Sequence, residues 1–218
     1  MCKRGVLQYS WLLPLAAGVL SSLPAQASLI INFVPVTVAA GTIGASFDVN
    51  LTNSGPSAQT ISAFSLGLSV SDSHITFTGG NTATTQTYLF NGDSFDVINA
   101  FPFTTVPPPN GQTVEASDNS NSGAGKSVAS GATVGLGHIL FNVAGNTSAG
   151  HIAVSLVSTC ATINSCTSLS DAAGANLAFA ANGGNITVTA SAMTPEPSTL
   201  LLALCAIPAL AWKRRKSA

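Results

Sequence analysis

Charged residues are scarce in this chain, and basic residues are almost absent from its middle. Of the 218 residues only 7% are charged, whereas soluble globular domains carry about 25%. Between residues 28 and 193 one basic residue, Lys126, stands against seven acidic ones, which gives this body a formal net charge of −6. Nucleic-acid binding requires clustered Lys and Arg that neutralise phosphates. We therefore expect no nucleic-acid partner.

Sequence signals of catalysis are also missing. Neither Gly-x-Ser-x-Gly nor His-Glu-x-x-His occurs. Gly92-Asp93-Ser94 is similar to the nucleophile block of GDSL-type esterases, but no His has the Asp three residues before it that those enzymes need, so we interpret it as a turn. The GAGKS stretch at 123–127 looks like the end of a P-loop, yet no apolar strand leads into it. The body also contains no Trp for stacking on sugar rings. We expect a protein that is not an enzyme.

Period-two alternation of apolar and polar residues runs through the body and predicts strands with one buried face. In residues 134–143 the alternation changes phase between Leu136 and Ile139, which predicts a bulge near Gly137. The low-complexity stretch 118–131 is expected to be a mobile loop. The predicted strands are 29–38, 43–51, 64–70, 75–78, 87–90, 95–98, 113–116, 134–143, 152–156 and 186–190. About nine or ten strands predict an all-β fold, an antiparallel β-sandwich or jelly roll, over residues 28–190.

The N-terminus has the features of a secretory signal peptide, residues 1–27. Two basic residues precede an apolar stretch, 11–20, and the small residues Ala25 and Ala27 stand before the expected cleavage at Ser28. The alternative is an uncleaved membrane anchor. We expect signal peptidase to act here and the body to be exported.

The C-terminal segment, 191–218, has three parts. An apolar run over 200–212 follows Pro195-Glu196-Pro197 and precedes a basic end, Lys213-Arg214-Arg215-Lys216. The apolar run is marginal for a membrane span, which needs about 20 residues, and the basic end should stay cytoplasmic. The alternative is an ordinary C-terminal anchor.

This three-part tail resembles the PEP-CTERM sorting signal of Gram-negative, polysaccharide-producing bacteria. The resemblance places the sorting motif on Pro195, Glu196 and Pro197. It implies a transient transmembrane helix in the inner membrane, recognition by an exosortase-type membrane protease, and delivery to the cell surface or extracellular matrix. The resemblance also implies extracellular polysaccharide as a partner.

The second half of the body, about residues 130–190, resembles cohesin-like and carbohydrate-binding-module β-sandwiches. The resemblance lies in GHILFNV at 137–143, GHIAV at 150–154, DAAG at 171–174 and GNITV at 184–188. Cohesins bind a dockerin partner and the related modules bind polysaccharide, so the resemblance implies these two kinds of partner as alternatives.

Two cysteines, Cys160 and Cys166, remain once the terminal segments are set aside. In an oxidising compartment we expect them to form a disulfide, worth about 2 kcal/mol in a loop this small. The alternative, a metal site, lacks a His nearby in the sequence.

Asp93 and Asp96 are weak candidates for calcium, which binds clustered oxygen ligands. Ordinary solvated carboxylates in a turn are the alternative, and we expect no cofactor. A secreted metal-dependent hydrolase would need His74, His138 or His151 within reach of Asp93. The function expected from the sequence is instead an exported surface or matrix protein with a non-catalytic structural or adhesive β-sandwich.

Overall fold

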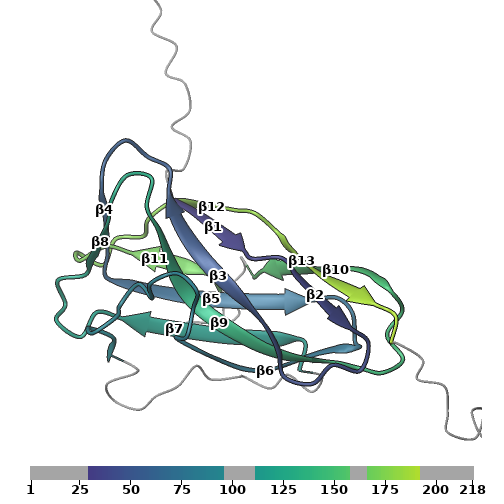
Figure 1. Ribbon diagram of the computed structural model, residues 1–218. Helices are drawn as coiled ribbons and strands as arrows, with labels where there is room; N and C mark the ends of the chain where they lie inside the picture. Colours follow the sequence, from purple (N-terminus) through teal and green to yellow (C-terminus); the bar gives the residue numbers. More distant parts are fainter. Residues whose placement is uncertain (1–28, 96–110, 158–165, 192–218) are drawn as a thin grey trace, which may run out of the picture.

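The body folds into two stacked β-sheets in this computed structural model, which describes residues 29–95, 111–157 and 166–191 (Figure 1). The helices expected at the two ends of the chain lie outside these ranges. Within them, no helix has the length and apolarity needed to cross a membrane. The first sheet has the order β12 (Phe179–Ala181), β1 (Leu29–Phe33), β3 (Ala45–Asn53), β9 (Thr133–Val143) and β6 (Ile75–Asn81).

The second sheet is built around β5 (Ala63–Val70), which has partners on both sides. One side of it pairs with β7 (Thr113–Asn119), while β10 (Gly150–Leu156) and β11 (Ser168–Ser170) pair with different parts of it. The other strands of this sheet are β13 (Gly184–Thr189) and β2 (Val36–Ala39). A small third sheet pairs β4 (Gln59–Ile61) with β8 (Lys126–Val128).

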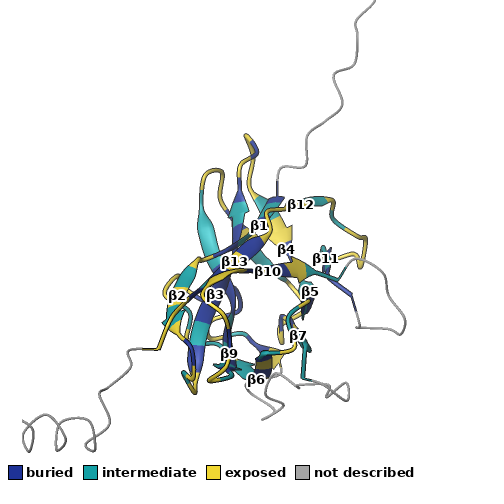
Figure 2. Ribbon diagram, turned by 90° about the vertical axis from the view of Figure 1, so that its right-hand side faces the viewer, coloured by how far each residue is buried: buried dark blue, intermediate teal, exposed yellow. Residues whose placement is uncertain are grey.

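The core lies between the two large sheets, because each strand turns its apolar alternate residues inward. Buried residues follow the strands, and exposed residues gather at the turns (Figure 2). Phe47 is central to an aromatic cluster, with ring centroids 6.0 Å from Phe33, 6.4 Å from Phe77 and 5.7 Å from Phe141. Each buried Phe side chain contributes about 1.5–3 kcal/mol. The alternation predicted from the sequence therefore packs a continuous core.

Two segments that are far apart in the sequence run side by side along one flank of the sandwich and pass together from one sheet to the other (Figure 1). β1 pairs with β12 in the first sheet, and β2 pairs with β13 in the second, both in parallel. Asn182 at the crossing donates its side-chain amide to Asn32 and its backbone N–H to Ile31. The fold is thus not purely antiparallel, and the single predicted strand 29–38 is two strands separated at Pro35.

The opposite flank is closed by residues 88–90 rather than by a strand. Tyr88, Leu89 and Phe90 are buried, and Tyr88 makes a single parallel bridge to Gly135. The rings of Phe64 and Phe90 stack with centroids 5.9 Å apart. The predicted strand 87–90 is wrong because its apolar residues fill the side of the core instead of extending a ladder.

The predicted bulge in β9 is confirmed. Val49 of β3 pairs with Gly137 of β9, but the next residue, Asn50, pairs with Gly135. Leu136 is therefore the extra residue, and it is fully buried. The bulge resets the alternation, which places Leu136 and Ile139 both in the core and His138 on the outer face.

Three other expectations need correction. The described residues contain thirteen strands, not nine or ten, because β4, β8, β11 and β12 have only three residues each and show no periodic pattern. The stretch 118–131, expected to be a mobile loop, contains the end of β7 and all of β8. Ile43, which the alternation places in a strand, is 82% exposed in the turn before β3.

Candidate functional site

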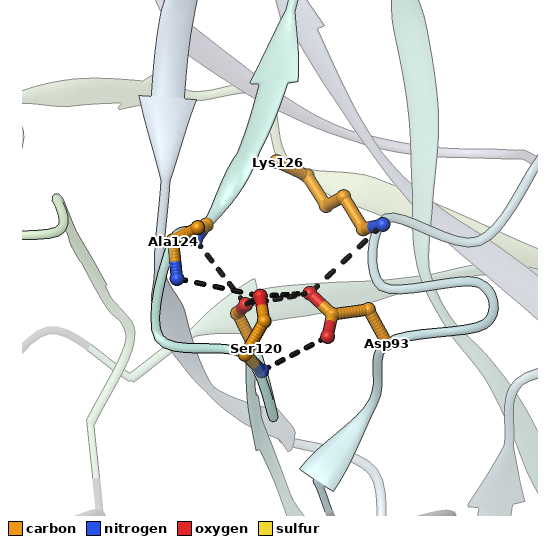
Figure 3. Close-up of polar contacts among 6 residues, drawn as sticks. Asp93, Ser120, Ala124 and Lys126 are labelled. Carbon is orange, nitrogen blue, oxygen red and sulfur yellow. Dashed lines mark hydrogen bonds and ion pairs between the residues drawn. The ribbon is translucent and has the colours of Figure 1, made fainter.

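Asp93 lies at the centre of a small polar cluster (Figure 3). Its carboxylate accepts hydrogen bonds from the hydroxyls of Ser120 and Ser122, at 2.6 and 2.9 Å, and from the backbone N–H of Ser122. Lys126 Nζ lies 3.9 Å from Asp93 Oδ2. The Ser120 hydroxyl, followed by Ser122 and Lys126, holds the pKa of Asp93 below its ordinary value, although partial burial opposes this.

This cluster holds two chain segments together. Asn121 donates its backbone N–H to the Asp93 carbonyl, and the Gly125 N–H reaches Ser120 Oγ. Gly92 adopts a φ of 73°, and Asp93 N–H bonds to Phe90 C=O, so Gly92-Asp93-Ser94 is a turn, as predicted. Asp96, the other calcium candidate, lies outside the described residues. Among those described, no three His, Cys, Asp or Glu side chains gather as metal ligands.

The three histidines lie on separate parts of the sandwich. His74 Nδ1 is 2.7 Å from Asp72, and His151 Nδ1 is 3.0 Å from the Thr187 hydroxyl on the outer face of the second sheet. His138 pairs with Asp48. None of their contacts in the described part of the chain reaches Asp93, so the arrangement needed for a hydrolase at Asp93 does not form there.

Asp48 and His138 form a cross-strand pair that sequence reasoning missed. Asp48 Oδ1 is 2.6 Å from His138 Nδ1, and Asp48 Oδ2 accepts the backbone N–H of Thr85 at 2.7 Å. Only 5% of Asp48 is exposed. Burial raises the pKa of Asp48, but hydrogen bonds from Thr85 and His138 outweigh it and leave this pKa below the ordinary value. The pair depends on the register of β3 against β9, which no residue pattern around Asp48 indicates.

Several predicted site residues fall partly or wholly outside the described ranges. Cys166 is disulfide-bonded and buried, but Cys160 lies outside, so the pairing of these two residues stays a prediction. The residues of the signal cleavage site, the sorting motif and the basic end also lie outside: Ala25, Ala27, Ser28, Pro195, Glu196, Pro197, Lys213, Arg214, Arg215 and Lys216.

By sequence, no family model and no curated protein matches the chain. Solved structures do match its shape. A chain of the Coh-OlpC–Doc435 complex, a type I cohesin–dockerin complex from Clostridium thermocellum, aligns with a TM-score of 0.55 at 10% identity, over 78% of this chain and 99% of that one. The sixth cohesin of Acetivibrio cellulolyticus scaffoldin B, solved with a mutant Cel5 dockerin, aligns with a TM-score of 0.54 at 12% identity, over 74% of this chain and 99% of that one. The seventh ScaB type I cohesin of Pseudobacteroides cellulosolvens aligns with a TM-score of 0.51 at 14% identity, over 77% of this chain and 96% of that one.

The body has the fold of a cohesin domain. The motifs that carried the resemblance hold this cohesin-like sandwich together. Asp171 Oδ1 accepts the backbone N–H groups of Ala173 and Ala175, and Gly174 takes a φ of 79°, so DAAG is a capped turn. GHILFNV and GNITV are strand segments within β9 and β13. These are structural roles, and the likeness at this level of identity concerns the fold alone.

Proposed function

We propose that this chain is an exported surface or extracellular-matrix protein whose cohesin-like sandwich makes non-catalytic structural or adhesive contacts. The observation that carries the non-catalytic role is the fold: the matching solved structures described above are of cohesins, two of them in cohesin–dockerin complexes. The separation of the three histidines from Asp93 supports it, because no group of metal-ligating side chains forms among the described residues.

Export and sorting belong to the same proposal and rest on the sequence of the two ends. The signal-peptide features of residues 1–27 support translocation, and the three-part tail supports recognition by an exosortase-type protease. The charge-poor, acidic body fits a matrix of polysaccharide better than an anionic membrane surface.

A dockerin-type partner is a variant of this function. An outer sheet face with exposed apolar residues would point to such a partner. The large apolar residues exposed in the described ranges are Val34, Ile43 and Phe95, and none of them belongs to a strand. We therefore place structural or adhesive contacts with the surrounding matrix ahead of dockerin binding.

Intact mass and cell fractionation in the exporting host test the proposal. We expect loss of residues 1–27 and of the tail beyond the motif, with the protein recovered from the surface or matrix. Changing Pro195, Glu196 and Pro197 to Ala should retain the tail and leave the protein in the membrane fraction. The matched control changes three flanking residues, Thr194, Ser198 and Thr199, to Ala. An unprocessed tail in the unmodified protein would overturn the sorting role.

A further inference from the structure

A hollow opens where the chain leaves the first sheet for the second. It lies between β2 and β3, has a volume of about 200 Å³, and we call it the β2–β3 hollow. Four separate segments contribute to it, which makes it a feature of the tertiary fold rather than of one loop. Its lining residues are Val34, Pro35, Val36, Ser46, Phe47, Asp48, Thr85 and His138.

The departure of β2 leaves backbone groups of β3 without a strand partner at this hollow. Val34 N–H donates to Asp48 C=O, so the backbone groups of every second residue of β3, including Ser46, face the β1 side. The residue that would come opposite Ser46 is Val36, which has already joined β13 in the second sheet. Among the described residues, the N–H and C=O of Ser46 therefore have no strand partner on this side and its hydroxyl makes no hydrogen bond, so these groups are available to a ligand.

The Asp48–His138 pair supplies an oriented imidazole to the same hollow. An ionised carboxylate only accepts hydrogen bonds, so the proton between them lies on His138 Nδ1. Both Asp48 oxygens are already used, by His138 and Thr85. His138 Nε2 makes no hydrogen bond in the described part of the chain, and a quarter of this side chain is exposed. In the neutral ring Nε2 is an acceptor that Asp48 holds in a fixed direction.

The remaining wall of the hollow is apolar. Val34 is 43% exposed, and Pro35 beside it is also exposed. A ligand that fits must present apolar C–H groups to this wall and hydroxyl groups to Ser46 and His138. A sugar ring has both kinds of surface.

The ends of the hollow exclude a longer occupant such as an added peptide strand. One end is closed by the hydrogen bond from Val34 N–H to Asp48 C=O. The other is closed by the turn that joins β2 to β3, in which Gly44 N–H bonds to the Asn142 side chain and Thr42 C=O accepts Val143 N–H. A strand could not run through both closures, whereas a single compact ring requires no passage.

Charge decides which kind of sugar fits. Asp48 is negative, and Lys126, the only Lys or Arg in the described ranges, is held near Asp93. No fixed positive charge is available to a carboxylated sugar. We propose that the β2–β3 hollow binds one neutral sugar unit, through His138 Nε2 and the polar groups of Ser46. This proposal names a ligand for the adhesive role proposed above. Only its biological meaning rests on that role.

Two-dimensional NMR of the full-length chain tests the site. The chain is kept in a phosphocholine detergent, because a sugar-headed detergent would compete. Methyl glucoside, methyl galactoside and methyl mannoside are added in turn, beside galacturonate. We expect at least one neutral glycoside to cause saturable shifts at Ser46, Thr85 and His138, and galacturonate to cause none. The absence of saturation with all three glycosides would overturn the proposal, as would equal binding of galacturonate.

Variants separate this site from general surface binding. His138→Gln should weaken the binding about tenfold, the cost of one hydrogen bond to the ligand. Ser46→Leu, which fills the hollow without changing the Asp48–His138 pair, should abolish it. The matched control is His151→Gln, an exposed histidine on the other sheet, which should bind as the unmodified protein does. Unchanged glycoside binding in Ser46→Leu would refute the site. The proposal of export and sorting does not depend on this result, because mass and fractionation test it separately.

Discussion

The phenol of Tyr88 donates a 2.6 Å hydrogen bond to Asp118 Oδ2 and so connects the flank of the first sheet to β7 of the second. Tyr88 is 7% exposed and Asp118 only 3%. Asp118 also accepts the backbone N–H of Asn119 through Oδ1. The contact closes the side of the sandwich where residues 88–90 replace a strand.

Replacing Tyr88 with Phe should therefore destabilise the domain. The change keeps the ring in contact with Phe64 but leaves a buried carboxylate with one donor fewer, which costs about 1–3 kcal/mol. Urea unfolding at neutral pH measures the difference. Thr42→Val, which removes an exposed hydroxyl bonded to Ala39 C=O, is the control and should change stability by less than about 0.5 kcal/mol. An equal effect of the two variants would contradict the role of Tyr88.

Asp48→Asn should make the domain less stable at neutral pH and less sensitive to acid. The pKa of Asp48 is lower in the folded protein than its ordinary 3.8, so its contribution is present above that value and is lost as pH falls through the folded pKa. We expect a difference of about 1–3 kcal/mol at pH 7. It should shrink as the pH is lowered below 3.8.

Urea unfolding at a series of pH values checks this dependence. Glu115→Gln is the control, since it removes one negative charge but no hydrogen bond in the described part of the chain. Its stability difference from the unmodified protein should vary less with pH. A difference for Asp48→Asn that grows on acidification would show that the sign is wrong.

The alternation of apolar and polar residues predicted most of the long strands, and the phase change in residues 134–143 predicted a bulge near Gly137, which the structure places at Leu136. Both are local signals, because a strand with one buried face must repeat every two residues. The short strands β4, β8, β11 and β12 carry no such signal. Their positions depend on tertiary pairing. For example, β12 pairs in parallel with β1, which lies 150 residues earlier in the sequence.

The same distinction applies to the candidate sites. Gly92-Asp93-Ser94 was predicted as a turn because the sequence lacks the Asp-x-x-His that an esterase would need, and its residue types are also common in turns. The Asp48–His138 pair and the β2–β3 hollow could not be predicted, because they require the register of β3 against β9 and the departure of β2 at Pro35. Sequence pattern indicates which face a residue is on, but not which residue comes opposite it.

Two neighbouring glycines at the start of β13 should respond differently to Ala. A Cβ on Gly184 would lie 2.4 Å from Phe33 Cβ and 2.6 Å from Phe33 Cγ, whereas one on Gly183 would meet only Val154 C=O at 3.8 Å. Gly184→Ala must therefore displace Phe33 from the aromatic cluster, a cost of about 1–3 kcal/mol. Gly183→Ala is the matched control and should be near neutral. Thermal unfolding of both variants measures this, and equal melting temperatures would contradict the close approach of Phe33.

Asp93 should act as a structural clamp rather than as a calcium ligand. Its carboxylate already accepts hydrogen bonds from the Ser120 and Ser122 hydroxyls and from the Ser122 backbone N–H, and Lys126 lies nearby. Asp93→Ala should therefore speed amide hydrogen exchange at Ser122. The Ala173 amide, which Asp171 holds in the same manner, is the internal control and should exchange as before. Millimolar calcium should leave the exchange at Ser122 of the unmodified protein unchanged, and a slowing that Asp93→Ala abolishes would instead make Asp93 a calcium ligand.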